Sequence, residues 1–153
     1  MNNKTLVLAP LAGQVVPLNA VPDPVFAKAM VGPGVAIEPH GRQGNVIDVV
    51  SPIAGSVGAL HPHAFAIKGV TAEVLVHLGL DTATLQGEPF EIQVDQGQDL
   101  QVGEWVVRWH VDRIGALSAV TPVVALGATD VNVLVNSGDE IAPGEPLFEI
   151  STV

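Results

Sequence analysis

Short apolar runs, interrupted every ten residues or so by glycine or proline, are the feature that most constrains the fold of this chain. The 153 residues include 16 Gly and 12 Pro, scattered through the whole length. Such punctuation favours short β-strands over long helices. The strands we expect cover residues 35–38, 44–50, 64–68, 72–80, 90–94, 105–110 and 146–150. With helical turns expected only at 24–30 and 111–117, the pattern predicts an all-β domain, an antiparallel sandwich or barrel with little helix.

Two pairs of similar segments recur at nearly the same spacing. VDQG at 94–97, followed by Gly-Glu at 103–104, resembles VNSG at 135–138, followed by Gly-Glu at 144–145, at an offset of 41 (138 − 97). APLAG at 9–13 resembles SPIAG at 51–55, at an offset of 42 (51 − 9). Because two independent features share nearly one spacing, the sequence predicts an internally duplicated β unit.

Composition limits the functions that need to be considered. Residues 1–153 have the length of one domain, which is the organisation we expect. A net charge of −10 with six Lys and Arg leaves no basic surface for a nucleic acid or an anionic membrane. No cysteine is present, and the apolar run at 6–10 is too short for an export signal or a membrane span. These features predict a cytoplasmic protein without disulfides or thiol chemistry.

Histidines are the side chains best suited to carry chemistry here, since the chain has five of them, no Cys and no Tyr. Strand alternation in the run at 73–78 places Glu73, Leu75 and His77 on one face. His63 opens a second alternating run, and the turn at 68–71 predicts a hairpin between the two runs. If the strands pair about the middle of that turn, the numbers of two residues directly opposite each other add up to about 140, and 63 and 77 add up to 140. The two imidazoles are therefore expected to face each other, with Cβ atoms roughly 5 Å apart.

Two adjacent imidazoles on a shallow apolar face are suited to phosphoryl transfer. Neutral imidazole is nucleophilic near pH 7, and its phosphoramidate is labile enough to be passed on. A second histidine can donate a hydrogen bond to the phosphoryl oxygens and stabilise their charge. We therefore expect one histidine of the pair to accept the group and the other to assist, without a cofactor. Asp81 is placed to meet a basic residue on a donor protein, and Gly79 leaves space for close approach.

Seven ordered blocks of the sequence closely resemble the glucose-type IIA proteins or domains of the bacterial phosphoenolpyruvate-dependent sugar phosphotransferase system. The resemblance covers residues 9–150. The blocks are APLAG at 9–13, VPDPVFA at 21–27, GPGVAIEP at 32–39, HAF at 63–65, VHLGLDT at 76–82, LQGEPF at 85–90 and TPVV at 121–124. The resemblance implies an antiparallel β-sandwich or barrel with Greek-key character and a shallow depression that holds two histidines.

Roles for individual residues follow from the resemblance. His77 takes the place of the family histidine that accepts phosphate at Nε2 from phosphohistidine on the carrier HPr and gives it to a cysteine on a IIB domain. His63 takes the place of the histidine that assists by hydrogen bonding. Asp23 and Asp81 match acidic positions that meet arginine on the donor, and Val25 and Phe26 match part of the apolar docking surface. Phe26 is equally consistent with simple core packing.

The sequence departs from the family just before His63. The family usually has Leu-Phe-Pro/Glu-Thr-x-His there, whereas this chain has Leu60-His61-Pro62-His63 and lacks both Phe and Thr. Since that Thr helps to hold the histidine network, we expect His61 either to replace it in the phosphate network, together with Gly79, or to add a metal ligand. The opening at residues 1–10 resembles that of fused multi-phosphoryl-transfer proteins, so this chain is expected to be a first domain of that type.

Other interpretations of the histidines stay open at this point. A single strand histidine such as His40 or His110 is more often a hydrogen-bonded structural residue. His61 and His63 also have the spacing of two metal ligands, and His77 would complete a three-histidine zinc site. That site would belong to a zinc-dependent hydrolase of the lysostaphin type, although the chain offers no Cys ligand. A third interpretation is a purely regulatory module that senses sugar supply through phosphorylation of His77.

Overall fold

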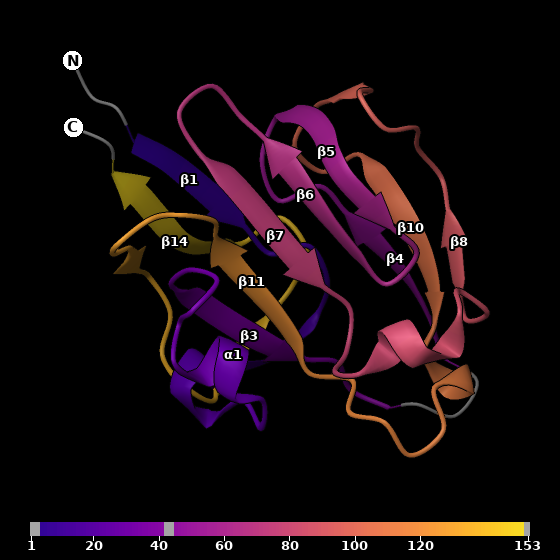
Figure 1. The fold of residues 1–153 in the computed structure, drawn as a ribbon. Helices are drawn as coiled ribbons and strands as arrows, with labels where there is room; N and C mark the ends of the chain where they lie inside the picture. Colours follow the sequence, from indigo (N-terminus) through magenta and orange to yellow (C-terminus); the bar gives the residue numbers. More distant parts are fainter. Residues whose placement is uncertain (1–3, 42–44, 152–153) are drawn as a thin grey trace.

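The computed structural model describes residues 4–41 and 45–151, most of which lie in short strands and the turns between them (Figure 1). The strands are β1 (Lys4–Leu8), β2 (Gly13–Pro17), β3 (Gly34–Glu38), β4 (Val46–Val50), β5 (Gly55–His61), β6 (Ala64–Lys68), β7 (Glu73–His77), β8 (Phe90–Ile92), β9 (Asp99–Leu100), β10 (Trp105–His110), β11 (Thr121–Ala125), β12 (Asn132–Val133), β13 (Glu140–Ile141) and β14 (Pro146–Ser151). The helical segments are η1 (Leu18–Ala20), α1 (Pro24–Ala27), η2 (Thr82–Leu85) and η3 (Val111–Arg113).

Three antiparallel sheets make up the domain. The largest has the strand order β13-β2-β3-β11-β7-β6-β5-β9, and the smaller ones have the orders β1-β14-β12 and β4-β10-β8. Figure 1 shows β1 and β14 beside one end of the large sheet and β4, β10 and β8 beside the other. Within the described ranges the large sheet is open, with β13 and β9 at its edges. The all-β prediction is therefore confirmed as a sandwich and not as a closed barrel.

Two apolar clusters cover the two faces of the large sheet. Alternate residues of the central strands divide between them: Val76 and Val123 belong to the main core, whereas Val124 and Leu75 contact the second cluster. The second cluster is completed by side chains of η1, α1 and their flanks, including Phe26, and by Leu80 from the segment between β7 and η2. Each fully buried aliphatic side chain stabilises the fold by about 1.5–3 kcal/mol. Because β11 is covered on both faces, all five of its residues are buried.

The duplication predicted from the sequence is visible as pairs of equivalent hydrogen bonds. Leu8 N donates to Pro52 O at 3.0 Å, and Val50 N donates to Pro10 O at 2.9 Å. Residues 8 and 50, and likewise 10 and 52, are equivalent at the offset of 42, so each copy donates to the other through the same bond. Equivalent bonds also tie the two glycine turns to the sheets, namely Gly97 N to Val57 O, Gly138 N to Val15 O, Gly103 N to Ser51 O and Gly144 N to Ala9 O. The domain is thus built from two interlocked copies of one unit.

Most predicted elements are present with shifted ends. The strands at 64–68 and 105–110 are confirmed to the residue, while the one predicted at 72–80 is shorter, since β7 covers 73–77. The strand predicted at 44–50 starts at Val46 in the described residues, and Gly44 lies outside them. Helical turns occur in both predicted places, as α1 and η3. The prediction missed the strands β1, β2, β5, β9, β11, β12 and β13.

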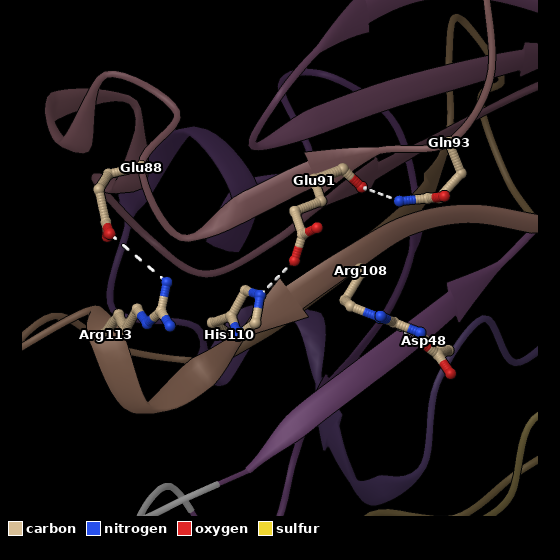
Figure 2. A network of polar contacts seen from close by, with 7 residues as sticks. All are labelled: Asp48, Glu88, Glu91, Gln93, Arg108, His110 and Arg113. Carbon is tan, nitrogen blue, oxygen red and sulfur yellow. Dashed lines mark hydrogen bonds and ion pairs between the residues drawn. The ribbon is translucent and has the colours of Figure 1, made fainter.

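A network of polar contacts covers the outer face of the β4-β10-β8 sheet (Figure 2). Arg108 Nε lies 3.2 Å from Asp48 Oδ1, and Arg113 Nη1 lies 3.6 Å from Glu88 Oε1. His110 Nε2 contacts the carboxylate of Glu91, whose pKa is lowered chiefly by this hydrogen bond. His40 Nε2 similarly lies 2.6 Å from Glu140 Oε2. Both histidines therefore have the structural role that is usual for single strand histidines.

The two equivalent turns predict equal costs for equivalent substitutions. Gly97 and Gly138 have φ values of 87° and 90°, and a Cβ on either glycine would meet nothing within 4 Å. Gly97→Ala and Gly138→Ala should therefore each lower the free energy of unfolding by about 1–2 kcal/mol, the cost of a left-handed conformation for an L-residue. Urea denaturation measures this. A cost in one variant less than half of that in the other would contradict the structural equivalence of the turns.

Candidate functional site

His77 lies at the end of β7, with its side chain on the outer face of the large sheet. Val74 and Val76 are fully buried on the core side, whereas Glu73, Leu75 and His77 are partly exposed. This alternation is the one predicted from the sequence. In Figure 1 the end of β7 lies near the turn that joins β5 to β6, where His63 is found. The antiparallel arrangement of β5, β6 and β7 therefore brings the two histidines to the same end of the sheet.

The predicted register is wrong by one residue. Ala64, and not His63, lies directly opposite His77. The reason is the turn: Lys68 pairs with Glu73 and Gly69 N donates to Ala72 O, so the hairpin axis falls between residues 70 and 71. His63 instead lies one step beyond the ladder, where its carbonyl accepts a hydrogen bond from Leu78 N at 2.7 Å.

The imidazoles nevertheless meet, as the sequence predicted. The ring centroids of His63 and His77 lie 5.1 Å apart with an interplanar angle of 73°. Phe26 lies against the other side of His77, with its ring centroid 5.2 Å away in an edge-on arrangement. Only 6% of Phe26 is exposed, so this side chain serves both as core packing and as the wall of the site. His77 is thus held between an aromatic ring and a second imidazole.

The carbonyl group of Gly79 fixes the tautomer of His77. His77 Nδ1 lies 2.6 Å from Gly79 O, and a carbonyl oxygen can only accept a hydrogen bond. Nδ1 therefore carries the proton in the neutral ring, and Nε2 keeps its lone pair. Nε2 is consequently the nucleophilic nitrogen of the site.

Glycine at position 79 is needed for this carbonyl to reach His77. Its φ is +80°, and an added Cβ would lie 2.7 Å from Thr82 Cγ2 and 2.8 Å from Ser118 O. Leu80 N donates to Ser118 O at 3.0 Å, and Thr82 Oγ1 donates to Leu78 O at 2.7 Å. The segment after β7 is therefore locked against the rest of the domain. Sequence reasoning missed Thr82 and Ser118, because Ser118 acts there through a backbone oxygen that has no sequence signature.

Electrostatics keep both histidines in the neutral form. Burial is the main reason why the pKa of His77 is lowered, opposed by the Gly79 hydrogen bond and by the carboxylates of Asp23 and Asp81. Burial also lowers the pKa of His63, and the neighbouring imidazoles of His77 and His61 lower it further. Neutral imidazole is the nucleophilic form, so the site is prepared for attack near pH 7.

The remaining predicted residues lie around this pair. Asp23 caps α1, where its Oδ1 accepts a hydrogen bond from Val25 N at 3.0 Å, and it orients α1 beside the site. Val25 is 43% exposed and available for contact with a partner. Asp81 follows Leu80 with a φ of +59° and leads into η2. Every candidate site residue other than Val25, His61 included, is thus linked to His77 or His63. The links are ring contacts, a hydrogen bond and electrostatic effects.

The zinc interpretation is not favoured by the geometry. Within residues 4–41 and 45–151, no group of three or more His, Cys, Asp or Glu side chains is arranged so that it could hold a metal ion. His61, His63 and His77 are therefore not such a group, although 5.8 Å separates the first two ring centroids and 5.1 Å the last two. A tetrahedral zinc site requires ligands that converge on one point.

Among the described residues, no helix is long and apolar enough to cross a membrane.

A duplicated β-sandwich with a neutral histidine pair on an open face, one ring held by a backbone carbonyl, defines a histidine phosphoryl carrier. Residues 5–131 match the family model for the phosphoenolpyruvate-dependent sugar phosphotransferase system, EIIA 1. The chain therefore belongs to this EIIA family, a group of phosphoryl carriers in sugar uptake within the transferase class. The hydrolase and purely regulatory alternatives are not favoured.

Individual relatives agree with this assignment. The chain is 41% identical over 141 residues to the PTS system glucose-specific EIIA components of Staphylococcus aureus strains COL and MRSA252, covering 89% of this chain and 81% of each relative. The glucose permease IIA from Mycoplasma capricolum has a similar structure, with a TM-score of 0.84, 31% sequence identity and coverage of 97% of this chain and 96% of that chain.

The lowered pKa of His77 predicts how its removal changes the pH dependence of stability. Above the ordinary histidine value of 6.5, the ring is neutral in both the folded and the unfolded state. As the pH falls below 6.5, the unfolded chain takes up the proton first, so the folded state loses stability down to the lower folded pKa. His77→Gln should therefore show a flatter decline in the free energy of unfolding between pH 7.5 and 5.5, measured by denaturant titration. A steeper decline than in the wild type would contradict the burial of a neutral ring.

Proposed function

We propose that His77 is the phosphoryl acceptor and that the group is taken from phosphohistidine on HPr and passed to a cysteine on a IIB domain during sugar uptake. The observation that carries this proposal is the 2.6 Å contact between His77 Nδ1 and Gly79 O, which leaves Nε2 as the nucleophile. No cofactor enters the reaction, because both steps are displacements at phosphorus between protein side chains.

Each step balances on the residues named. In the first, the lone pair of His77 Nε2 forms a bond to phosphorus while the N–P bond to the HPr imidazole breaks, and that imidazole leaves with the electron pair. The His77 ring then carries a positive charge, stabilised by the Nδ1–H···O=C bond to Gly79 and by the carboxylates of Asp23 and Asp81. In the second step a IIB thiolate attacks phosphorus, and neutral His77 is the leaving group.

His63 is proposed to stabilise the transferring group without attacking it. Its ring centroid lies 5.1 Å from that of His77, close enough for a ring N–H to reach a phosphoryl oxygen on Nε2. Its pKa is lowered by burial and by the neighbouring imidazoles in the unphosphorylated protein, so it avoids charge repulsion with His77 before the group arrives. The negative charge of the phosphoryl group then favours hydrogen donation from His63.

Partner docking is proposed at the rim formed by Asp23, Val25, Phe26 and Asp81. The exposed Val25 offers an apolar contact, and the two carboxylates offer charges to arginine on a basic partner face. The net charge of −10 would steer such partners to this acidic protein. We place the chain in the cytoplasm as a single IIA domain, and the glucose-specific names of its relatives support a glucose-type permease as the final acceptor.

Labelling with the donor system tests the acceptor directly. The full chain is incubated with phosphoenolpyruvate, Enzyme I and HPr, and acid-labile phosphate is detected by intact mass. Wild type should gain one phosphoryl group, and His77→Ala should gain none. His63→Ala should still be labelled but should pass the group to a IIB domain at least about 100-fold more slowly, as expected when an oxyanion-stabilising donor is lost.

His40→Ala is the matched control, because His40 is an exposed histidine paired with Glu140 and is not among the site residues. It should be labelled and discharged like the wild type. An unlabelled wild type, or a His77→Ala variant that is labelled normally, would overturn the proposed function.

A further inference from the structure

A third imidazole extends the histidine pair towards solvent. His61 ends β5, and its ring centroid lies 5.8 Å from that of His63 with an interplanar angle of 32°. His63 is in turn 5.1 Å from His77. His61 is exposed, whereas His63 and His77 are partly buried. The three rings thus form a row that leads from the surface to the proposed acceptor.

The placement of His61 is built into the sheet. His61 pairs with Ala64 across the β5–β6 hairpin, which fixes its backbone beside the site. Pro62, between the two histidines, lies against Gly87, where an added Cβ would come within 3.1 Å of Pro62 Cγ. Both ends of the His61-Pro62-His63 segment are also tied down, since the carbonyl of His63 accepts a hydrogen bond from Leu78 N. The fold therefore fixes the backbone that carries the three rings.

We propose that His61 is the proton-exchange residue of the carrier site, so that the phosphorylated protein binds a larger fraction of one proton, shared by His61 and His63, than the unphosphorylated protein does. The proposal rests on the proposed role of His77 as acceptor. On phosphorylation the proton comes from solvent through His61, and it returns to solvent when a IIB thiolate removes the phosphoryl group. His61 acts through His63 and the phosphoryl oxygens, and is therefore a positioning residue rather than a catalytic one.

Charge reversal at the site provides the driving force. Without phosphate, the neighbours of His63 are two other imidazoles, and their effect together with burial lowers its pKa. The other charged groups that act on the site are Asp23, ahead of α1, and Asp81, after β7, and both act on His77. Glu88 follows Gly87, the residue against which Pro62 lies, and its carboxylate is paired with another group, since Glu88 Oε1 lies 3.6 Å from Arg113 Nη1. A phosphoryl group brings a charge of about −1.5 to −2 to the row. The single positive charge on the phosphorylated His77 ring offsets only part of it, so the site becomes net negative and imidazolium is favoured there.

The uptake is expected to be limited to no more than one proton. Two imidazolium rings with centroids 5.8 Å apart would repel each other, so protonation of one ring disfavours protonation of the next. Burial makes the charge costlier on His63 than on the exposed His61. The exposed ring therefore holds and exchanges the proton, while His63 keeps a hydrogen bond to the phosphoryl oxygens. A lower pH then favours the loaded carrier, and a higher pH favours transfer onwards.

NMR titration of the histidine ring protons tests the proposal on the full chain. Resonances of His61 and His63 are followed between pH 6 and 9 in the unphosphorylated protein and in protein kept phosphorylated by phosphoenolpyruvate with catalytic Enzyme I and HPr. The titration midpoint of His61 should rise by about half a pH unit or more on phosphorylation, as expected for an exposed group near a net negative charge. An unchanged or lower midpoint overturns the proposal.

Variants link the titration to function. His61→Gln removes the titrating ring, and His40→Gln is the matched control at an exposed histidine outside the site. The equilibrium constant for phosphoryl transfer from phospho-HPr should fall as the pH is raised from 6 to 8. This fall should be about threefold larger in the wild type and in His40→Gln than in His61→Gln, because a threefold change in an equilibrium constant corresponds to half a pKa unit. Equal pH dependence in all three, with His77 phosphorylated, overturns the role of His61 alone. Failure of His77 to be phosphorylated overturns the proposed function, and this inference with it.

Discussion

The central position of β7 in the large sheet is the constraint on which the rest of the site depends. β7 is paired with β6 on one side and with β11 on the other, and its inward residues Val74 and Val76 are fully buried. A strand fixed on both edges and packed on its inner face cannot shift or rotate. His77 at the end of β7 therefore has a fixed position on the outer face of the sheet. The carbonyl of Gly79, two residues later, accepts a hydrogen bond from its Nδ1.

Duplication builds the scaffold, but the site lies in only part of it. The equivalent bonds between residues 8 and 52 and between residues 50 and 10 interlock the two copies. The hairpin of β6 and β7, the capped helix α1 and the segment after Gly79 are what distinguish the histidine face. A symmetric framework thus supplies rigidity, while local segments supply the nucleophile, its assisting histidine and the surrounding carboxylates.

The sequence predicted the all-β fold, the duplication and the meeting of His63 with His77, because alternation and repeated glycine turns are local signals. It missed β11, since a strand buried on both faces shows no alternation and Pro122 argued against a strand. The one-residue register error arose because turn geometry, and not the apolar pattern, sets the hairpin axis. The hydrogen bond from Leu80 N to Ser118 O joins backbone atoms that are far apart in the sequence, and it leaves no sequence pattern.

The most direct test of this account is the nitrogen chemistry of His77, observed by ¹⁵N NMR before and after phosphorylation. The bond from Nδ1 to Gly79 O predicts a neutral ring with its proton on Nδ1 and, after phosphorylation, a phosphorus–nitrogen coupling at Nε2. A proton on Nε2 in the free protein, or phosphorus attached to Nδ1, would contradict the claim that the Gly79 carbonyl selects the nucleophile.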